Sequence, residues 1–173
     1  MTTRTRPLIA PLLVAGTFLS GLSGGGLLVG SAHATTAWGG ADTTPARFAA
    51  HMGVAYGVFR HWATLPYQRG YFALGQPDRP ARLGRAAAAL LATERDLGAA
   101  LIIARRDPAL RPLAPLVGGM ANGYQALAAT FRSGTVSAIG MRGTIGLTLH
   151  TEAAQHKLGV PVRETNPVPG SPF

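Results

Sequence analysis

A stretch near the end of the chain, "LTLHTEAAQHKLG" (147–159), carries the residue types best suited to chemistry, because two histidines flank a glutamate. Side chains four residues apart on a helix lie on the same face, so Glu152 and His156 would form a pair. His150, six residues before His156, would point in a different direction. Carboxylate and imidazole together are ligands for iron, manganese or zinc. The chemistry that this stretch predicts is metal binding.

A metal site needs more ligands than this pair, and two other helices supply candidates. Glu94 falls between Leu90 and Leu97 on an apolar face, and His51 lies on the flank of the first expected helix. Burying a carboxylate is costly unless it is paired, protonated or bound to a metal. The hypothetical site inside the bundle therefore has the ligands Glu94, Glu152, His156 and His51.

A purely structural interpretation of the same residues stays open. Ferritin-like di-iron bundles carry a Glu-x-x-His motif on two helices, whereas this chain has one Glu-x-x-x-His and no second copy. In this preferred interpretation both glutamates lie at helix edges and pair with an arginine such as Arg95, Arg105 or Arg142. His156 then lies near a helix C-terminus, where a positive charge is stabilised by the helix dipole.

The aromatic and methionine side chains indicate haem as a second possible cofactor. They form two stripes at helical spacing, Phe48, Met52, Phe59 and Trp62 in one segment and Met120, Tyr124 and Phe131 in another. Such stripes could line a pocket for haem or lipid, with His51, Met52 or Tyr124 as axial ligands. Stripes of this kind usually form the hydrophobic core. We therefore expect no resident cofactor, with a transition metal or haem as the alternative.

Motifs of known enzyme classes are scarce. The chain has no cysteine, which excludes thiolate metal sites, thiol-based redox centres and cysteine nucleophiles. His150 and Glu152 match the H-x-E of zinc deaminases, but the P-C-x-x-C partner of that motif is missing. The chain also contains no H-E-x-x-H, G-x-S-x-G or Walker motif. A binding or interaction protein is therefore expected in preference to an enzyme.

Four segments with helical apolar spacing would position these residues. The fourth also alternates apolar and polar residues at "TIGLTLHT", as a strand would, but no second strand is expected to pair with it. Thr44 and Pro45 indicate where the first helix starts, and Pro66 where it ends. We predict an all-α, antiparallel (up-down) four-helix bundle with a Pro-rich C-terminal tail. Its helices are expected over 45–65, 80–106, 113–132 and 135–158.

The first 34 residues have the pattern of a secretory signal peptide. Arg4 and Arg6 precede an uncharged run over 7–30, and Ala32 and Ala34 occupy the −3 and −1 positions of an A-x-A cleavage site. An uncleaved membrane anchor is the alternative. The expected organisation is a signal peptide (1–34), a flexible leader (35–44), the helical bundle (45–158) and an extended, mobile tail (159–173). The expected location is extracytoplasmic, at the cell envelope or secreted.

The charge is strongly positive, with 16 Lys and Arg against 7 Asp and Glu. Without Arg4 and Arg6 the balance is 14 against 7, a formal charge of +7. Such a surface favours anionic partners. The arginines are spread over an Ala-, Gly- and Pro-rich chain, as bacterial coding bias would also produce. We expect a protein or envelope component as the partner, with an anionic polymer as the alternative and no disulfide-linked partner.

Overall fold

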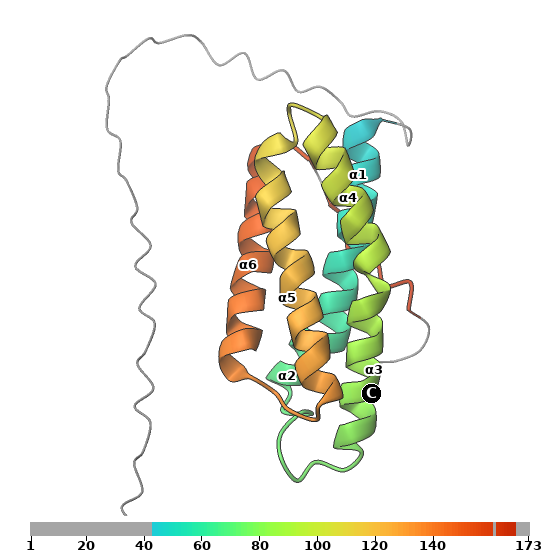
Figure 1. Ribbon diagram of the computed structural model, residues 1–173, viewed down its shortest axis with the longest axis vertical. Helices are drawn as coiled ribbons and strands as arrows, with labels where there is room; N and C mark the ends of the chain where they lie inside the picture. Colours follow the sequence, from blue (N-terminus) through green and yellow to red (C-terminus); the bar gives the residue numbers. More distant parts are fainter. Residues whose placement is uncertain (1–42, 161, 169–173) are drawn as a thin grey trace, which may run out of the picture. The chain divides into compact units, whose positions relative to one another are not determined.

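A computed structural model describes residues 43–160 and 162–168 of the chain. The expected signal peptide, its cleavage residues Ala32 and Ala34, and nearly all of the expected leader lie outside the described residues. The described part contains helices and connecting segments but no β-strand, and its helices run along a common axis as a four-helix bundle (Figure 1). The predicted fold class is confirmed. None of the helices in this part is both long enough and apolar enough to span a lipid bilayer.

The first helical rod is longer than predicted because it passes through a proline. It comprises α1 (Thr44–Phe59), a π-helical turn η1 (Arg60–Thr64) and α2 (Leu65–Gln68), which follow one another directly. Thr43 caps the start, since its hydroxyl accepts a hydrogen bond of 3.3 Å from the amide of Ala46. Pro66 directly follows the π-helical turn, where the amide of Leu65 donates to the carbonyl of Arg60 and the regular i to i−4 pattern, which a proline cannot join, is already interrupted. The rod therefore continues beyond Pro66, where the sequence predicted its end.

The second rod consists of two helices where the sequence predicted one. α3 (Arg79–Ala92) and α4 (Glu94–Arg106) meet at Thr93, which is buried and whose hydroxyl donates to the carbonyl of Leu90 at 2.7 Å. A short turn, η2 (Arg111–Leu113), leads into α5 (Ala114–Arg132), and α6 (Ala138–Lys157) completes the bundle. The ambiguous fourth segment is thus helical, as predicted.

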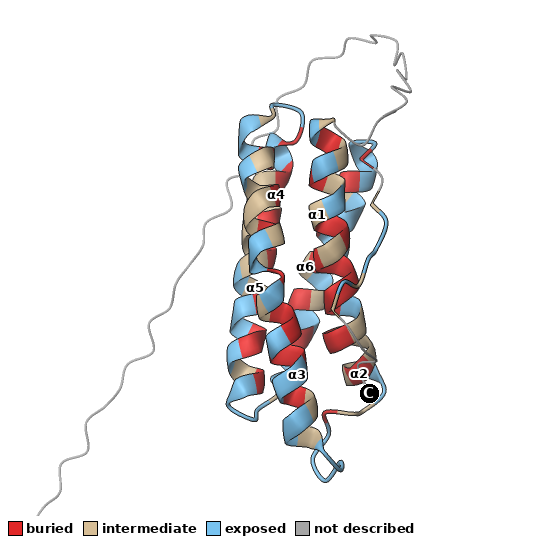
Figure 2. Ribbon diagram, turned by 90° about the vertical axis from the view of Figure 1, so that its right-hand side faces the viewer, coloured by how far each residue is buried: buried red, intermediate tan, exposed pale blue. Residues whose placement is uncertain are grey.

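The two predicted aromatic and methionine stripes form the core. α1 packs against α4, α3 against α5, and α5 also against α4 and α6. The inward faces of these helices are buried and the outward faces exposed (Figure 2). The seven residues of the stripes are all buried, each with at most 3% of its surface exposed: Phe48, Met52, Phe59, Trp62, Met120, Tyr124 and Phe131.

The buried face of α6 differs from the predicted one. Helical apolar spacing predicts an inward face with Met141, Ile145, Leu149 and Ala153, and Glu152 and His156 among them, but Leu149 is 59% exposed. The buried residues after Met141 lie one position before Ile145, Leu149, Glu152 and His156, which turns the helix by about 100°: Thr144, Thr148, Thr151 and Gln155. Burying the threonines costs little because Thr148 and Thr151 donate to the carbonyls four residues earlier, both at 2.8 Å.

The described part of the tail is attached to α1. The amide of Thr165 donates to the carbonyl of Gly53 at 3.0 Å. A Cβ atom would lie 2.2 Å from the carbonyl oxygen of Arg163 if placed on Gly53, and 2.0 Å from that of Thr165 if placed on Gly57. Only glycine permits such close approach. The tail was predicted to be extended and mobile; residues 162–168 are non-helical, and their contacts hold them against α1.

Candidate functional site

The two glutamates of the hypothetical metal site lie on the surface instead of in the core. Glu94, in the first turn of α4, is exposed, and its Oε1 accepts a hydrogen bond of 3.1 Å from Nε2 of Gln125. Its predicted direction assumed an unbroken helix through Thr93, which the structure does not have. Glu152 and His156 are both exposed because α6 is turned away from its predicted orientation. His156 lies in the last turn of α6, as the structural interpretation expected.

His51, the fourth predicted metal ligand, pairs with an aspartate and not with the two glutamates. Nδ1 of His51 lies 2.8 Å from Oδ1 of Asp96, linking α1 to α4. Within residues 43–160 and 162–168, no three His, Asp or Glu side chains gather in a way that could hold a metal ion. Neither Glu94 nor Glu152 forms an ion pair with an arginine in this part of the chain, contrary to the structural interpretation. The structure does not bring the four predicted ligands together.

The two other residues proposed for haem belong to the core. Met52 and Tyr124 have 0% and 1% of their surfaces exposed, and both pack within the main hydrophobic cluster. The hydroxyl of Tyr124 donates to the carbonyl of Ala55 at 3.4 Å. These side chains therefore occupy the interior that the stripes were predicted to form.

A cleft opens where the bundle is least tightly closed. α6 packs on α5 and makes no extensive backbone contact with α1. Between the first rod and α6 lies a hollow of about 350 Å³, which we call the α1–α6 cleft. Residues of α1, η1, α2, α6 and the tail line it: Tyr56, Phe59, Arg60, Thr64, Leu65, Gln68, Ile145, Thr148, Leu149, Glu152 and Glu164.

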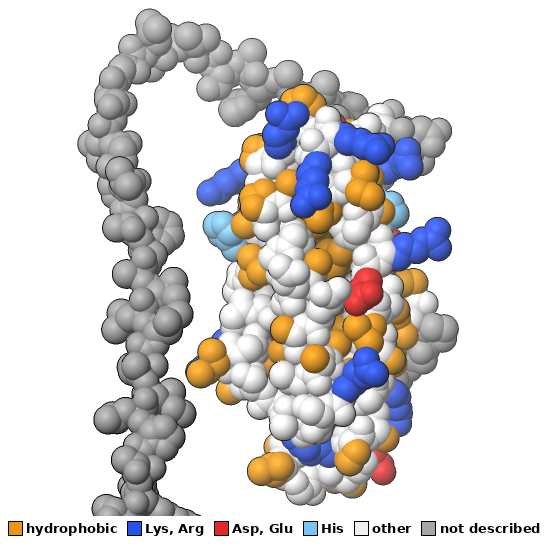
Figure 3. Space-filling view, in the orientation of Figure 1, with side chains coloured by type: hydrophobic (Ala, Val, Ile, Leu, Met, Phe, Trp, Pro, Cys, Tyr) orange, Lys and Arg blue, Asp and Glu red, His pale blue; other side chains and the backbone are white. Residues whose placement is uncertain are grey.

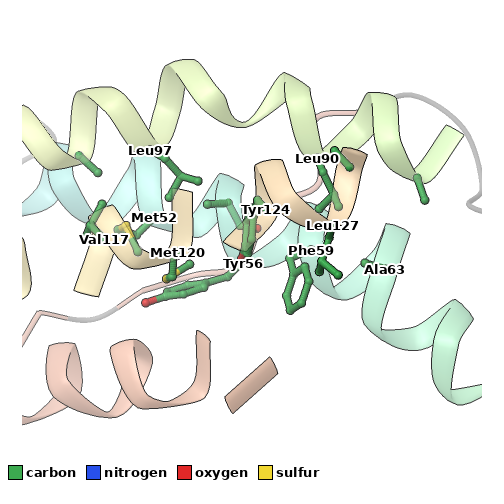
Figure 4. Packing of buried hydrophobic residues seen from close by; sticks show 14 of the residues in the cluster. Met52, Tyr56, Phe59, Ala63, Leu90, Leu97, Val117, Met120, Tyr124 and Leu127 are labelled. Atoms are coloured by element: carbon green, nitrogen blue, oxygen red, sulfur yellow. The ribbon is translucent and has the colours of Figure 1, made fainter. Parts of the chain in front are cut away.

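Two aromatic rings form the inner wall of the cleft. Tyr56 and Phe59 reach from α1 to the side of the core where α6 lies (Figure 4). The ring of Phe59 stacks on that of Tyr124, with centroids 4.7 Å apart and planes at 20°. The hydroxyl of Tyr56 donates to Oε1 of Gln155 on α6. The inner wall is therefore held in place by the core on one side and by α6 on the other.

Gln155 has hydrogen-bonding capacity that its neighbours do not use. The residue is 1% exposed, and its Nε2 has no hydrogen-bond partner in the described part of the chain. The carboxamide has two different ends, and Tyr56 can serve only one of them whichever way the group is turned. Buried polar groups are nearly always paired. Gln155 itself does not line the cleft, and its carboxamide reaches the inner wall only through Tyr56.

Two carboxylates stand at the cleft, one on each side. Glu164 comes from the tail, and Nη1 of Arg60 donates to both of its oxygens, at 3.0 and 3.1 Å. Glu152 comes from α6 and makes no hydrogen bond or ion pair within residues 43–160 and 162–168. Seven acidic residues occur in the whole chain, so two of them at one cleft is a marked concentration.

The tyrosine hydroxyls beside these carboxylates stay protonated far into alkaline pH. Burial is the main reason why the pKa of Tyr56 is raised, and the nearby charges of Tyr124 and Glu152 raise it further. The pKa of Tyr124 is raised mainly by burial, and a hydrogen bond with Thr148 partly opposes the shift. Tyr56 therefore presents a neutral hydroxyl, which can donate and accept hydrogen bonds.

A second groove offers less specific chemistry. It has a volume of about 510 Å³ and runs along the first half of α1 beside the tail. Its lining is mostly small and apolar and contains no acid and no aromatic ring: Pro45, Ala46, Ala49, Ala50, Val54, Val160, Arg163 and Thr165. Ligand sites orient their ligands through a few well-placed polar groups. The α1–α6 cleft has more polar side chains in its lining than this second groove has.

Among the residues that line the cleft, sequence reasoning singled out Glu152 as a metal ligand and Phe59 as part of a stripe that forms the core or lines a haem or lipid pocket. Tyr56 and Gln155 are 99 residues apart, and Arg60 and Glu164 are 104 residues apart. Spacing along one helix carries no information on such contacts. The pair Gly53 and Gly57, one helical turn apart, was the one local signal that another segment approaches α1 closely.

Comparison of the chain with protein-family models, with curated proteins and with solved structures finds no match.

Proposed function

We propose that this chain is an exported binding protein of the bacterial cell envelope or extracellular space, which holds a small organic ligand in the α1–α6 cleft. The proposal of export rests on the pattern of residues 1–34. The proposal of binding rests on one observation: a cleft of ligand size in which aromatic, hydroxyl and carboxylate groups from distant parts of the chain meet.

The size and composition of the cleft suit a small molecule. Ligand pockets usually have volumes of roughly 300–1,000 Å³, with apolar walls and a few polar groups that orient the ligand. At about 350 Å³ the cleft lies at the lower end of this range. Phe59, Leu65, Ile145 and Leu149 provide apolar surface, and Thr64 and Thr148 provide hydroxyls.

The test is a ligand-observed NMR screen of small charged and neutral compounds against the full chain. Leu149 is 59% exposed and lines the cleft, so Leu149→Trp would fill the cleft without crowding the core. Ile139 lies on the same helix, is 79% exposed and does not line the cleft, so Ile139→Trp is the matched control. We expect hits that Leu149→Trp abolishes and Ile139→Trp leaves unchanged. A screen in which every hit tolerates Leu149→Trp would contradict the proposal.

One observation favours a second candidate, binding of anionic polymers. Arg105 and Arg106 end α4, Arg111 begins η2 and Lys157 ends α6, and all four are exposed without an ion pair in the described part of the chain. Blue basic side chains gather at the same end of the bundle in Figure 3. Binding of single-stranded DNA that weakens steeply between 50 and 200 mM salt would support this candidate, and salt-independent binding would reject it.

A further inference from the structure

We infer that the α1–α6 cleft selects ligands with a cationic amine head group joined to an apolar body, with Glu152 as the counter-ion. This inference rests on the proposed function and names the class of ligand. It depends on three features of the cleft: the charge of its lining, the character of its inner wall and the hydrogen bonds that its lining can still make.

The lining is acidic in a protein that is otherwise strongly basic. Of its three charged side chains, Arg60 and Glu164 neutralise each other through hydrogen bonds of 3.0 and 3.1 Å. The carboxylate of Glu152 has no partner in the described residues, which leaves one uncompensated negative charge at the cleft. A cation there would gain an ion pair, and an anion would meet a like charge with no cation free to compensate it.

The walls of the cleft offer apolar surface for the body of the ligand. Tyr56 and Phe59 bound the cleft on its inner side, with only 3% and 2% of their surfaces exposed. Ile145 and Leu149 line it from α6, and Leu149 is 59% exposed. The apolar body of a ligand can pack against these side chains while its cationic head group pairs with Glu152.

The carboxylate of Glu152 can accept further hydrogen bonds. An ammonium group has three donors and no acceptor. The hydroxyl of Thr148 already donates to the carbonyl of Thr144 and is also hydrogen-bonded with Tyr124. The acceptor that the lining offers an amine is therefore the exposed carboxylate of Glu152.

The test compares three probes that differ only in the head group: 2-phenylethylamine, 2-phenylethanol and phenylacetate. Their dissociation constants for the full chain are measured by NMR titration at low salt. We expect the amine to bind at least about 10-fold more tightly than the alcohol, because a hydrogen bond to a charged group is stronger than one between neutral groups. The anion is expected to bind most weakly.

The variant Glu152→Gln isolates the charge, because it keeps the size of an exposed side chain. It should reduce the preference for the amine over the alcohol to less than about 3-fold, with little change in the affinity for the alcohol. Glu94→Gln is the matched control, since Glu94 is an exposed carboxylate on α4 outside the cleft. Glu94→Gln should leave the preference unchanged.

The outcomes separate the inference from the proposed function. Equal or tighter binding of the alcohol or the anion, abolished by Leu149→Trp, would overturn the inference and leave a ligand-binding cleft. An amine preference that survives Glu152→Gln would also overturn it. Failure of every compound in the wider screen to bind in a manner sensitive to Leu149→Trp would overturn both.

Discussion

Gly57 on α1 and Thr165 in the tail approach so closely that a Cβ atom on Gly57 would lie 2.0 Å from the carbonyl oxygen of Thr165. This contact places Glu164, the residue before Thr165, beside Arg60 on the next turn of the first rod. Trp62 then donates to the side chain of Asn166 at 3.1 Å. The tail thus contributes Glu164 to the lining of the cleft, and it can do so because α1 has a glycine where the tail crosses it.

Substitution of this glycine tests the attachment of the tail. Gly57→Ala should displace residues 163–166 and destabilise the fold by about 1–3 kcal/mol, because the backbone of the tail cannot yield without losing its contacts. Gly98→Ala on α4 is the control, since a Cβ there meets no atom within 4 Å. That change should stabilise the protein by up to about 1 kcal/mol through helix propensity. Urea denaturation measures both effects.

Hydrogen exchange reports the position of the tail directly. The amide of Thr165 is bonded to the carbonyl of Gly53, so it should be protected in the wild type and exchange faster in Gly57→Ala. If this amide keeps its protection in the variant, the proposed contact between Gly57 and the tail is wrong.

The hydrogen bond between Tyr56 and Gln155 gives a second prediction. Tyr56→Phe should cost about 1–3 kcal/mol, because it leaves the buried carboxamide of Gln155 with no partner among the described residues. The double variant Tyr56→Phe/Gln155→Met removes both polar groups and should recover most of this loss. Tyr67→Phe, at a partly exposed tyrosine of α2, should change stability by less than about 0.5 kcal/mol. Equal losses of stability in the Tyr56→Phe variant and the double variant would show that the hydrogen bond does not contribute to stability.

Stability should fall in alkaline solution. Both Tyr56 and Tyr124 have a pKa above the ordinary value near 10 when folded, so above pH 10 the unfolded chain releases protons that the folded chain retains. The stabilisation is therefore complete below pH 10 and is lost as the pH rises above it. The slope is up to about 1.4 kcal/mol per pH unit for each hydroxyl.

Absorbance at 295 nm, which detects tyrosinate, checks the ionisation itself. At pH 11 the folded wild type and folded Tyr56→Phe should show the same tyrosinate signal, because Tyr56 is protonated in the wild type. A smaller signal in the variant would mean that Tyr56 ionises in the folded protein, contrary to the predicted shift.

The helices were predictable because local signals define them. Pro45 marks the start of α1, although Thr43 caps this helix in place of the expected Thr44. Ser137 caps α6 through the amide of Gly140 at 3.0 Å, and apolar spacing identifies the stripes. The buried face of α6 was not predictable from apolar spacing. Thr148 and Thr151 are buried while Leu149 is exposed, because the two threonine hydroxyls donate to carbonyls of their own helix and leucine gains little at an open cleft.

The cleft itself depends on information that spacing cannot supply. The rotation of α6 by one residue decides that Gln155 meets Tyr56 in the core and that Glu152 lines the cleft. The predicted direction of Glu94 was wrong because it treated 80–106 as one continuous helix. In the structure two helices meet at Thr93, and this junction changes the direction of the side chains that follow. Contacts between residues about a hundred positions apart, such as that of Arg60 with Glu164, follow from packing of the whole bundle.

The most direct test of the proposed function is chemical-shift mapping of the tightest-binding compound from the screen on the isotope-labelled full chain. If the ligand binds in the cleft, the amide signals of Thr64, Thr148 and Glu152, which come from both of its sides, should shift saturably, and these shifts should be lost in Leu149→Trp. Saturable shifts confined to other surfaces, or shifts at these three residues that persist in Leu149→Trp, would contradict it.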